Sequence, residues 1–182
     1  VSVDGIPVNM VTHAHGQGYA DLHWLMPEVV EAVDVRQGPF DVRDGDFATA
    51  GAVTFRTKDR LPTSSLIVRG GTFDSRHVIA LAPLGGDAST AGGYLEGSAH
   101  FSDGPFEAPQ GYRRLTGFGR FTAPVSRGAE VVATLSAFDS EWDASGQIPD
   151  RAVRAGMVPR FGAIDATEGG TTSRYDIGLG LR

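Results

Sequence analysis

The chain has 182 residues, a formal net charge of −6 and no cysteine. The acidic balance and the lack of any Lys/Arg run exclude the positively charged surface of a nucleic-acid-binding protein, and the missing cysteines exclude disulfides and thiolate metal sites. The 25 glycines favour strands and turns over helices, and the longest apolar run, 78–84, is far shorter than the ~20 residues of a membrane-spanning helix.

The first residues, 1–9, read VSVDGIPVN and predict a strand, which is followed by a polar loop at 10–19. His13 and His15 in this loop, with His23 nearby, could suggest a metal site, because imidazoles two residues apart on a strand lie on the same face. No third type of ligand stands at a convincing spacing. We therefore interpret these histidines as polar loop residues and expect neither a bound metal nor a cofactor.

Residues 27–59 predict two strands joined by a tight turn. Apolar residues alternate in both strands, at Val29, Val33 and Val35 and then at Ala52, Val53 and Phe55. The residues between them that suit sharp turns and close approach of backbones are Gly38, Pro39, Gly45 and Gly51. The second strand ends in a Thr-Lys pair at Thr57 and Lys58.

From residue 64 onward the sequence is a series of two-residue alternations. Odd-numbered residues are apolar or glycine, and even-numbered residues are mostly polar, in the segments 93–101, 115–123, 131–137 and 175–181. Two earlier segments, 64–73 and 76–84, are strand-like but less regular. Since side chains alternate between the faces of a strand, each segment has one apolar and one polar side. The pattern predicts an all-β fold with about six antiparallel strands in this part of the chain.

Two classes of protein fit this alternation. Segments of roughly 9 to 11 residues with one apolar side are what the tilted strands of a transmembrane β-barrel require, with the apolar side against lipid. A soluble β-sandwich or a lipocalin-type barrel has the same period but turns its apolar side inward. Periodicity alone does not separate the two classes, whereas the burial of the apolar side does. The diagnostic side chains are Leu115, Phe121, Val131 and Leu135.

The stretch 142–174 is long for a connection without a strand pattern, and connections of that length are generally functional or disordered. It carries apolar residues along much of its length, at Trp142, Ile148, Val153, Met157, Phe161 and Ile164. We therefore expect it to be folded, with a short helical turn near 150–155.

The order of residues in 27–59 resembles the signature that closes the plug domain of TonB-dependent outer-membrane receptors. The signature has an acidic residue, a V-x-V strand, Gly-Pro, a further Gly, a run of small residues ending in Gly, and a strand ending in Thr-Lys. The upstream 1–9 resembles the preceding plug strand of the same family, which commonly reads V-D-G-x-P-V. The chain departs from the family at Gln37, where a basic residue is usual, and at Asp44, where an aromatic residue is usual.

The resemblance implies that 1–59 is the C-terminal part of a small glycine-rich plug domain and that 60–182 supplies the first strands of an incomplete transmembrane β-barrel, both belonging to a longer protein. It implies a location in the outer membrane of a Gram-negative bacterium and a function in the energised uptake of a scarce nutrient of unknown class. The implied partners are outer-membrane lipid, the nutrient, and a TonB-type energy-coupling protein that contacts a segment upstream of residue 1. The connections 102–111 and 141–172 would then face the outside.

In this family the loop after the V-D-G-x-P-V strand reaches the outward side of the plug, where it can touch the ligand. The candidate ligand-binding residues in this loop and in the long connection are His13, His15, Gln17, Tyr19, Trp142, Arg151 and Arg154. Aromatic and Arg side chains would suit an anionic or ring-containing ligand. Alternatively, the arginines of the long connection pair with Asp150, Asp165 and Glu168 and hold that connection together.

An enzyme is the weakest interpretation of the sequence. It has no recognisable set of nucleophile, base and oxyanion donors and no G-x-S-x-G motif. The main alternative to the receptor is a soluble extracellular β-sandwich or lipocalin-like ligand-binding module. A structural, adhesin-like β protein would need regular repeats, which the sequence lacks.

Overall fold

The computed structural model describes residues 1–13, 16, 18–45, 48–85 and 90–182. The chain forms two compact units, Val1–Asp59 and Arg60–Arg182. This division falls where the sequence changes from the β-turn-β segment to the long alternations. No helix among the described residues is long and apolar enough to cross a membrane.

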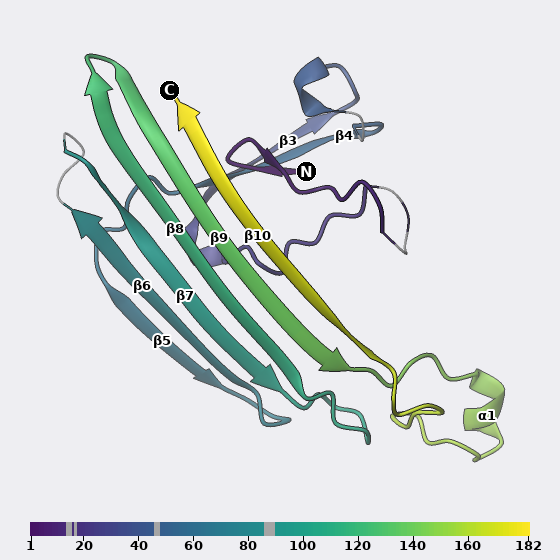
Figure 1. The fold of residues 1–182 in the computed structure, drawn as a ribbon. Coiled ribbons are helices and arrows are strands. Elements are labelled where there is room, and N and C mark those ends of the chain that lie inside the picture. Colours follow the sequence, from purple (N-terminus) through teal and green to yellow (C-terminus); the bar gives the residue numbers. More distant parts are fainter. Residues whose placement is uncertain (14–15, 17, 46–47, 86–89) are drawn as a thin grey trace. The chain divides into compact units, whose positions relative to one another are not determined.

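The first unit contains a four-stranded sheet with the order β2-β1-β4-β3 (Figure 1). Its elements are β1 (Ser2–Val3), β2 (Ile6–Pro7), the 3-10 helix η1 (Pro27–Val29), β3 (Val30–Gln37), the 3-10 helix η2 (Val42–Asp44) and β4 (Gly51–Thr57). β1 runs parallel to β4, whereas β1–β2 and β3–β4 are antiparallel pairs. The segment 1–9 is thus a short hairpin rather than the single strand expected, because Asp4 and Gly5 turn the chain with φ values of +48° and +84°.

β3 and β4 form the predicted β-turn-β unit. Their paired residues include Val33 with Phe55 and Val35 with Val53, so the two apolar alternations face each other. Gly51, with φ near +155°, is required where β4 begins, since a Cβ there would lie 2.2 Å from the carbonyl oxygen of Arg36. The glycine therefore permits the close approach of the two backbones.

Val29 departs from the predicted alternation. It lies in η1 rather than in β3 and is fully buried, while Val33 and Val35 are 49% and 67% exposed. The register of β3 against β4 shifts between Val30 and Ala32, which separates Val29 from the regular strand. Among the described residues of this unit, the buried apolar ones are Val3, Val8, Trp24, Met26 and Val29.

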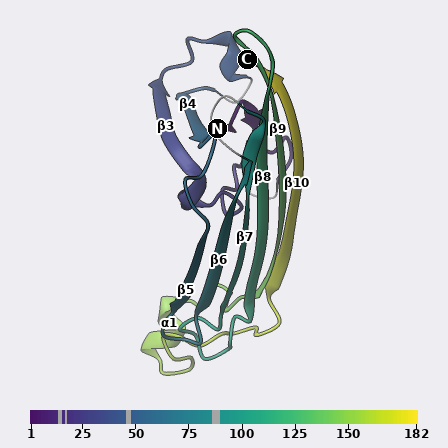
Figure 2. The ribbon, with the colours of Figure 1, turned by 90° about the vertical axis from the view of Figure 1, so that its left-hand side faces the viewer.

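The second unit is a six-stranded antiparallel sheet in which the strands follow chain order, with β5 and β10 at its edges (Figures 1 and 2). The strands are β5 (Ser65–Gly70), β6 (Arg76–Gly85), β7 (Gly92–Ser102), β8 (Tyr112–Ser126), β9 (Ala129–Asp143) and β10 (Gly169–Leu181). The expected all-β fold with six antiparallel strands is confirmed. β5 is shorter than the predicted 64–73, because the chain turns at Phe73 and Asp74, where φ is positive.

The connections at the two ends of this sheet differ in length. One end carries the connections 71–75, 103–111 and 144–168, which join β5 to β6, β7 to β8 and β9 to β10 (Figure 1). At the opposite end, only Arg127 and Gly128 separate β8 from β9. The connection 86–91 between β6 and β7 is also at that opposite end and is slightly longer than 71–75. The two longest connections, 103–111 and 144–168, therefore share one end of the sheet.

The connection 144–168 contains the helix α1 (Asp150–Arg154), which confirms the helical turn predicted near 150–155. The connection is shorter than the predicted 141–172, because β9 continues to Asp143 and β10 already begins at Gly169.

Several apolar residues of this connection are exposed rather than buried within it. Met157, Phe161 and Ile164 are 78%, 50% and 63% exposed. Phe161 instead packs edge-on against Phe106 of the β7–β8 connection, with ring centroids 6.2 Å apart. The backbone N–H of Glu107 also donates a hydrogen bond of 2.9 Å to the carbonyl oxygen of Phe161. The two long connections are thus joined to each other.

The two faces of the six-stranded sheet differ in burial. One side carries the odd-numbered residues of β7 and β10, the odd-numbered residues in the paired parts of β8 and β9, and their register partners on β5 and β6. We call this side the apolar face. We call the opposite side the polar face. Exposed side chains of the apolar face include Leu66, Val68, Leu95, Leu115, Phe121, Leu135, Ile177 and Leu179. Buried residues of the polar face include Ile79, Tyr94, Glu96, Ser98, Thr116, Phe118, Arg120, Thr122, Ser136, Phe138 and Ser140.

Candidate functional site

The two sequence motifs of the first unit meet at Asp4. The turn after β1 directs the Asp4 carboxylate to the end of β4, where it accepts hydrogen bonds from the backbone N–H of Thr57 at 2.9 Å and from its hydroxyl at 2.6 Å. Thr57 itself is buried. Lys58 connects the same strand end to η1 by two hydrogen bonds. Its Nζ donates to the carbonyl oxygen of Glu28 at 2.7 Å, and its backbone N–H donates to the carbonyl oxygen of Val29 at 2.8 Å. The Asp of the first motif and the Thr-Lys pair of the second thus form one hydrogen-bonded junction.

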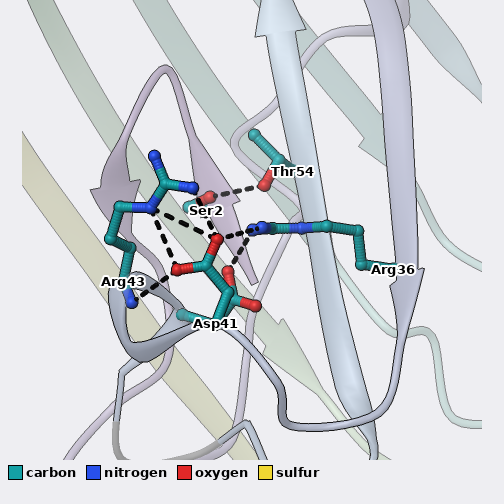
Figure 3. A network of polar contacts seen from close by, with 6 residues as sticks. Ser2, Arg36, Asp41, Arg43 and Thr54 are labelled. Atoms are coloured by element: carbon teal, nitrogen blue, oxygen red, sulfur yellow. Dashed lines mark hydrogen bonds and ion pairs between the residues drawn. The ribbon is translucent and has the colours of Figure 1, made fainter.

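A second polar network closes the connection between β3 and β4 (Figure 3). The Asp41 carboxylate accepts hydrogen bonds from Arg43 Nη2 at 2.6 Å and from Arg36 Nη1 at 2.7 Å, and Arg36 also pairs with Asp44. These bonds, those from Arg43 above all, hold the pKa of the Asp41 carboxyl well below its usual range. Asp44 therefore helps to hold Arg36 in place.

Two of the four candidate residues of the loop 10–19 lie against each other. The rings of His13 and Tyr19 stack with centroids 4.2 Å apart and an interplanar angle of 15°. The loop is closed at its base, because the N–H of Met10 donates to the carbonyl oxygen of Tyr19 and the N–H of Gly18 to that of Met10, both at 2.8 Å. The other two candidates, His15 and Gln17, lie outside the described residues.

The two described histidines of the first unit, His13 and His23, each contact another side chain. His23 Nδ1 lies 2.7 Å from Asp21 Oδ1, and His13 is stacked on Tyr19. Among the described residues, no group of three His, Cys, Asp or Glu side chains is placed to hold a metal ion.

Trp142 borders a cavity of about 520 Å³ at the end of β9 and β10. The cavity is polar, with the carboxylates of Glu141 and Asp143 and the hydroxyl-bearing Thr167 and Thr171 on its wall. The indole ring of Trp142 needs a glycine beside it, since a Cβ at Gly170 would lie 2.9 Å from the ring.

The candidate arginines Arg151 and Arg154 are not brought to Trp142. Both lie on α1, and neither lines the cavity at Trp142. Arg154 pairs with Asp150 at 2.6 Å, one helical turn away, and both side chains are highly exposed. For Arg154 the structure therefore agrees with a role in holding the connection together, and an exposed pair of this kind contributes little to stability.

A group of rings and cations on the polar face was not among the candidates from the sequence. His77 on β6 and His100 on β7 are direct cross-strand partners, with ring centroids 4.9 Å apart. The His100 ring also contacts Tyr112 edge-on, with centroids 5.4 Å apart.

The histidine pair could be predicted from the sequence by counting residues outward from the connection between β6 and β7. β6 and β7 are consecutive antiparallel strands, and Gly85 pairs with Gly92 beside their connection, so residues equally far from that pair lie opposite each other. His77 and His100 are each eight residues away from it. Alternation alone places a side chain on a face, but it does not say which residue of the next strand lies beside it.

No protein-family model matches the chain, and a search of the curated proteins finds no match. Function is therefore inferred from the sequence motifs and from the geometry of the described residues.

Proposed function

We propose that the chain is part of a TonB-dependent outer-membrane receptor, in which residues 1–59 are the C-terminal part of the plug and residues 60–182 are the first six strands of the barrel. The observation that carries the proposal is the reversed polarity of the six-stranded sheet, which exposes its apolar face and buries its polar face.

The reversal is clearest in the middle of the sheet. Leu95, Leu135 and Ile177 lie in one cross-strand row of the apolar face and are 52%, 58% and 85% exposed. Glu96 and Ser136, on the opposite face of the same strands, are 5% and 4% exposed. A water-soluble sandwich does the opposite, because burying apolar surface is what drives its folding. An exposed apolar band with polar residues on the other side is the pattern of a strand between lipid and a polar lumen.

The junction at Asp4 is the second support. The two sequence motifs that resemble the plug are far apart in the chain, yet Asp4 of the first accepts both hydrogen bonds from Thr57 of the second. Such a junction gives the two motifs a shared physical purpose in one small β domain.

In this proposal the barrel surrounds an aqueous lumen that the plug blocks at rest. A nutrient binds from outside and passes when a TonB-type coupling protein pulls on the plug. With β5 rising from the periplasmic side, the connections 71–75, 103–111 and 144–168 face outward. The lengths of 103–111 and 144–168, compared with the two-residue turn between β8 and β9, are in keeping with the long outer loops and short periplasmic turns of outer-membrane barrels. His13 and Tyr19 of the plug and Trp142 of the barrel are the described ligand-binding candidates. The protein acts by binding and transport rather than by catalysis.

Fractionation of the cells that produce the protein tests this function. An antiserum against residues 150–168 should detect the protein in the outer-membrane fraction after extraction with alkaline carbonate, which removes peripheral proteins. A soluble periplasmic protein serves as the control and should be removed. Recovery of the protein in a soluble or secreted fraction would contradict the proposal and favour the soluble ligand-binding module.

A further inference from the structure

We propose that the cavity at the end of β9 and β10 binds a saccharide. The cavity lies at the end of the sheet that carries the connections 103–111 and 144–168. The site rests on the proposed function for the side from which the ligand comes, and it gives that ligand a chemical class. Its wall belongs to the second unit alone.

The size of the cavity suits a small ligand. Its volume of about 520 Å³ lies within the range of roughly 300–1,000 Å³ that is usual for ligand pockets. Three residues of its wall, Gly111, Gly169 and Gly170, have no side chain to fill it. A Cβ at Gly169 would lie 2.5 Å from the carbonyl oxygen of Trp142, and a Cβ at Gly170 would lie 2.9 Å from the indole ring. A larger residue at either position would therefore displace Trp142.

Trp142 supplies the aromatic surface of the site. It is the register partner of Gly170, so its indole ring lies over a residue without a side chain. Trp142 is half-buried and lines the cavity. A flat aromatic ring packs against the C–H face of a pyranose, and the indole N–H is a hydrogen-bond donor. Trp142 can thus recognise a ring that carries no charge.

The polar groups of the wall include both acceptors and donors. Glu141 and Asp143 offer carboxylate oxygens, and Thr167 and Thr171 offer hydroxyl groups. In the described part of the chain, no hydrogen bond or ion pair engages the side chain of Asp143 or of Thr171. A saccharide hydroxyl is itself a donor and an acceptor, so it can donate to a carboxylate and accept from a threonine. A saccharide therefore uses both kinds of group on the wall.

The same wall disfavours ionic ligands. An anion would meet the carboxylates of Glu141 and Asp143, and Arg113, which donates to Glu141 at 2.9 Å, balances only one of these charges. An organic cation would find an acceptor at Asp143 and a π surface at Trp142, but it would leave the hydroxyl donor of Thr171 unused. The organic cation is therefore the competing ligand that the test has to separate.

The test uses the intact receptor, meaning the longer protein to which the proposed function assigns this chain. The receptor is purified in dodecyldimethylamine N-oxide, because detergents with glucose or maltose headgroups would compete for the site. An array of neutral mono- to tetrasaccharides is screened with the labelled receptor, and the saccharide that binds most tightly is then titrated by calorimetry. At least one saccharide should bind. Tetramethylammonium and citrate should bind about tenfold more weakly or not at all.

Competition separates two sources of the saccharide. Displacement of the receptor from the array by the same saccharide free in solution assigns a soluble ligand. Displacement only by lipopolysaccharide from the producing cells assigns a glycolipid of the cell surface.

Matched variants locate binding at this cavity. Gly170→Ala should weaken binding about tenfold, because its Cβ would displace the indole ring, whereas Gly180→Ala on the same strand has open space around it and should leave binding unchanged. Asp143→Asn removes a charged acceptor and should weaken binding about fivefold, whereas Asp150→Asn on α1, outside the cavity, should not. Trp142→Phe keeps an aromatic ring and should retain more affinity than Trp142→Ala.

The saccharide site would be ruled out if no saccharide of the array bound, if tetramethylammonium bound more tightly than every saccharide, or if Gly170→Ala and Gly180→Ala weakened binding equally. Each of these results leaves the proposed function standing as long as the receptor fractionates with the outer membrane. Recovery of the protein as a soluble species would instead remove the proposed function, whatever the saccharide affinity.

Discussion

The junction between Asp4 and Thr57 consists of two hydrogen bonds to one carboxylate. Asp4 has a positive φ, which Asp tolerates better than most residues, and its two carboxylate oxygens each accept one bond from Thr57. The hydrogen bonds are charge-assisted, and the hydroxyl donor sits on a buried residue. Removal of that donor takes one charge-assisted hydrogen bond away from the half-buried carboxylate.

Thr57→Val should therefore loosen the end of β4. A hydrogen bond to a charged group contributes about 1.5–3 kcal/mol, which corresponds to a tenfold or larger rise in local opening. Amide hydrogen exchange of residues 51–58 in the intact protein measures this local opening. Thr54→Val on the same strand is the control, because it removes only the neutral bond from the Ser2 hydroxyl at 3.1 Å (Figure 3). Equal exchange rates in the two variants would contradict a special role for Thr57.

At the scale of strands, alternation predicted most of the second unit, because a period of two residues is a direct consequence of strand geometry. The limits of this prediction appear at Phe118 and Phe138, which lie on the polar face and are buried there. Alternation places Phe118 on the same face as Thr116, but it does not reveal that this face is the buried one. The histidine pair and the Asp4 junction were missed for a related reason, since both depend on which distant residue lies opposite.

The two faces should respond differently to the same charge. Leu135→Arg places a cation on the apolar face in the central row and should cost about 2–4 kcal/mol of insertion if that row lies near the bilayer midplane. Thr134→Arg places it one residue away on the polar face, opposite Arg120, where repulsion between cross-strand cations costs no more than about 1 kcal/mol. Folding titrations of the intact protein into lipid vesicles measure the free-energy cost of each of the two substitutions. Equal costs would contradict the assignment of the two faces.

At the scale of the whole molecule, the six-stranded sheet has two open edges and an uncovered apolar face. β5 exposes Leu66 and Val68, and β10 exposes Ile177 and Leu179, the latter at 85% and 80%. Unpaired edges and apolar patches of this kind promote association in water. Six strands also do not close a plugged barrel of the proposed kind.

Residues 1–182 produced alone should accordingly aggregate in plain buffer and disperse only with detergent. Light scattering and sedimentation at several protein concentrations measure this directly. A sharp unfolding transition of a monomer, independent of concentration and without detergent, would argue for a soluble fold.

The orientation of the sheet in a membrane is tested most directly by labelling single cysteines on intact cells. The 182 residues contain no cysteine, so Ala155→Cys beside α1 and Arg127→Cys in the β8–β9 turn introduce one thiol each at exposed positions on opposite ends of the sheet. A membrane-impermeant maleimide should label residue 155 on intact cells and residue 127 only after the outer membrane is permeabilised. Labelling of both residues on intact cells, or of residue 127 alone, would contradict a barrel that presents its long connections to the outside.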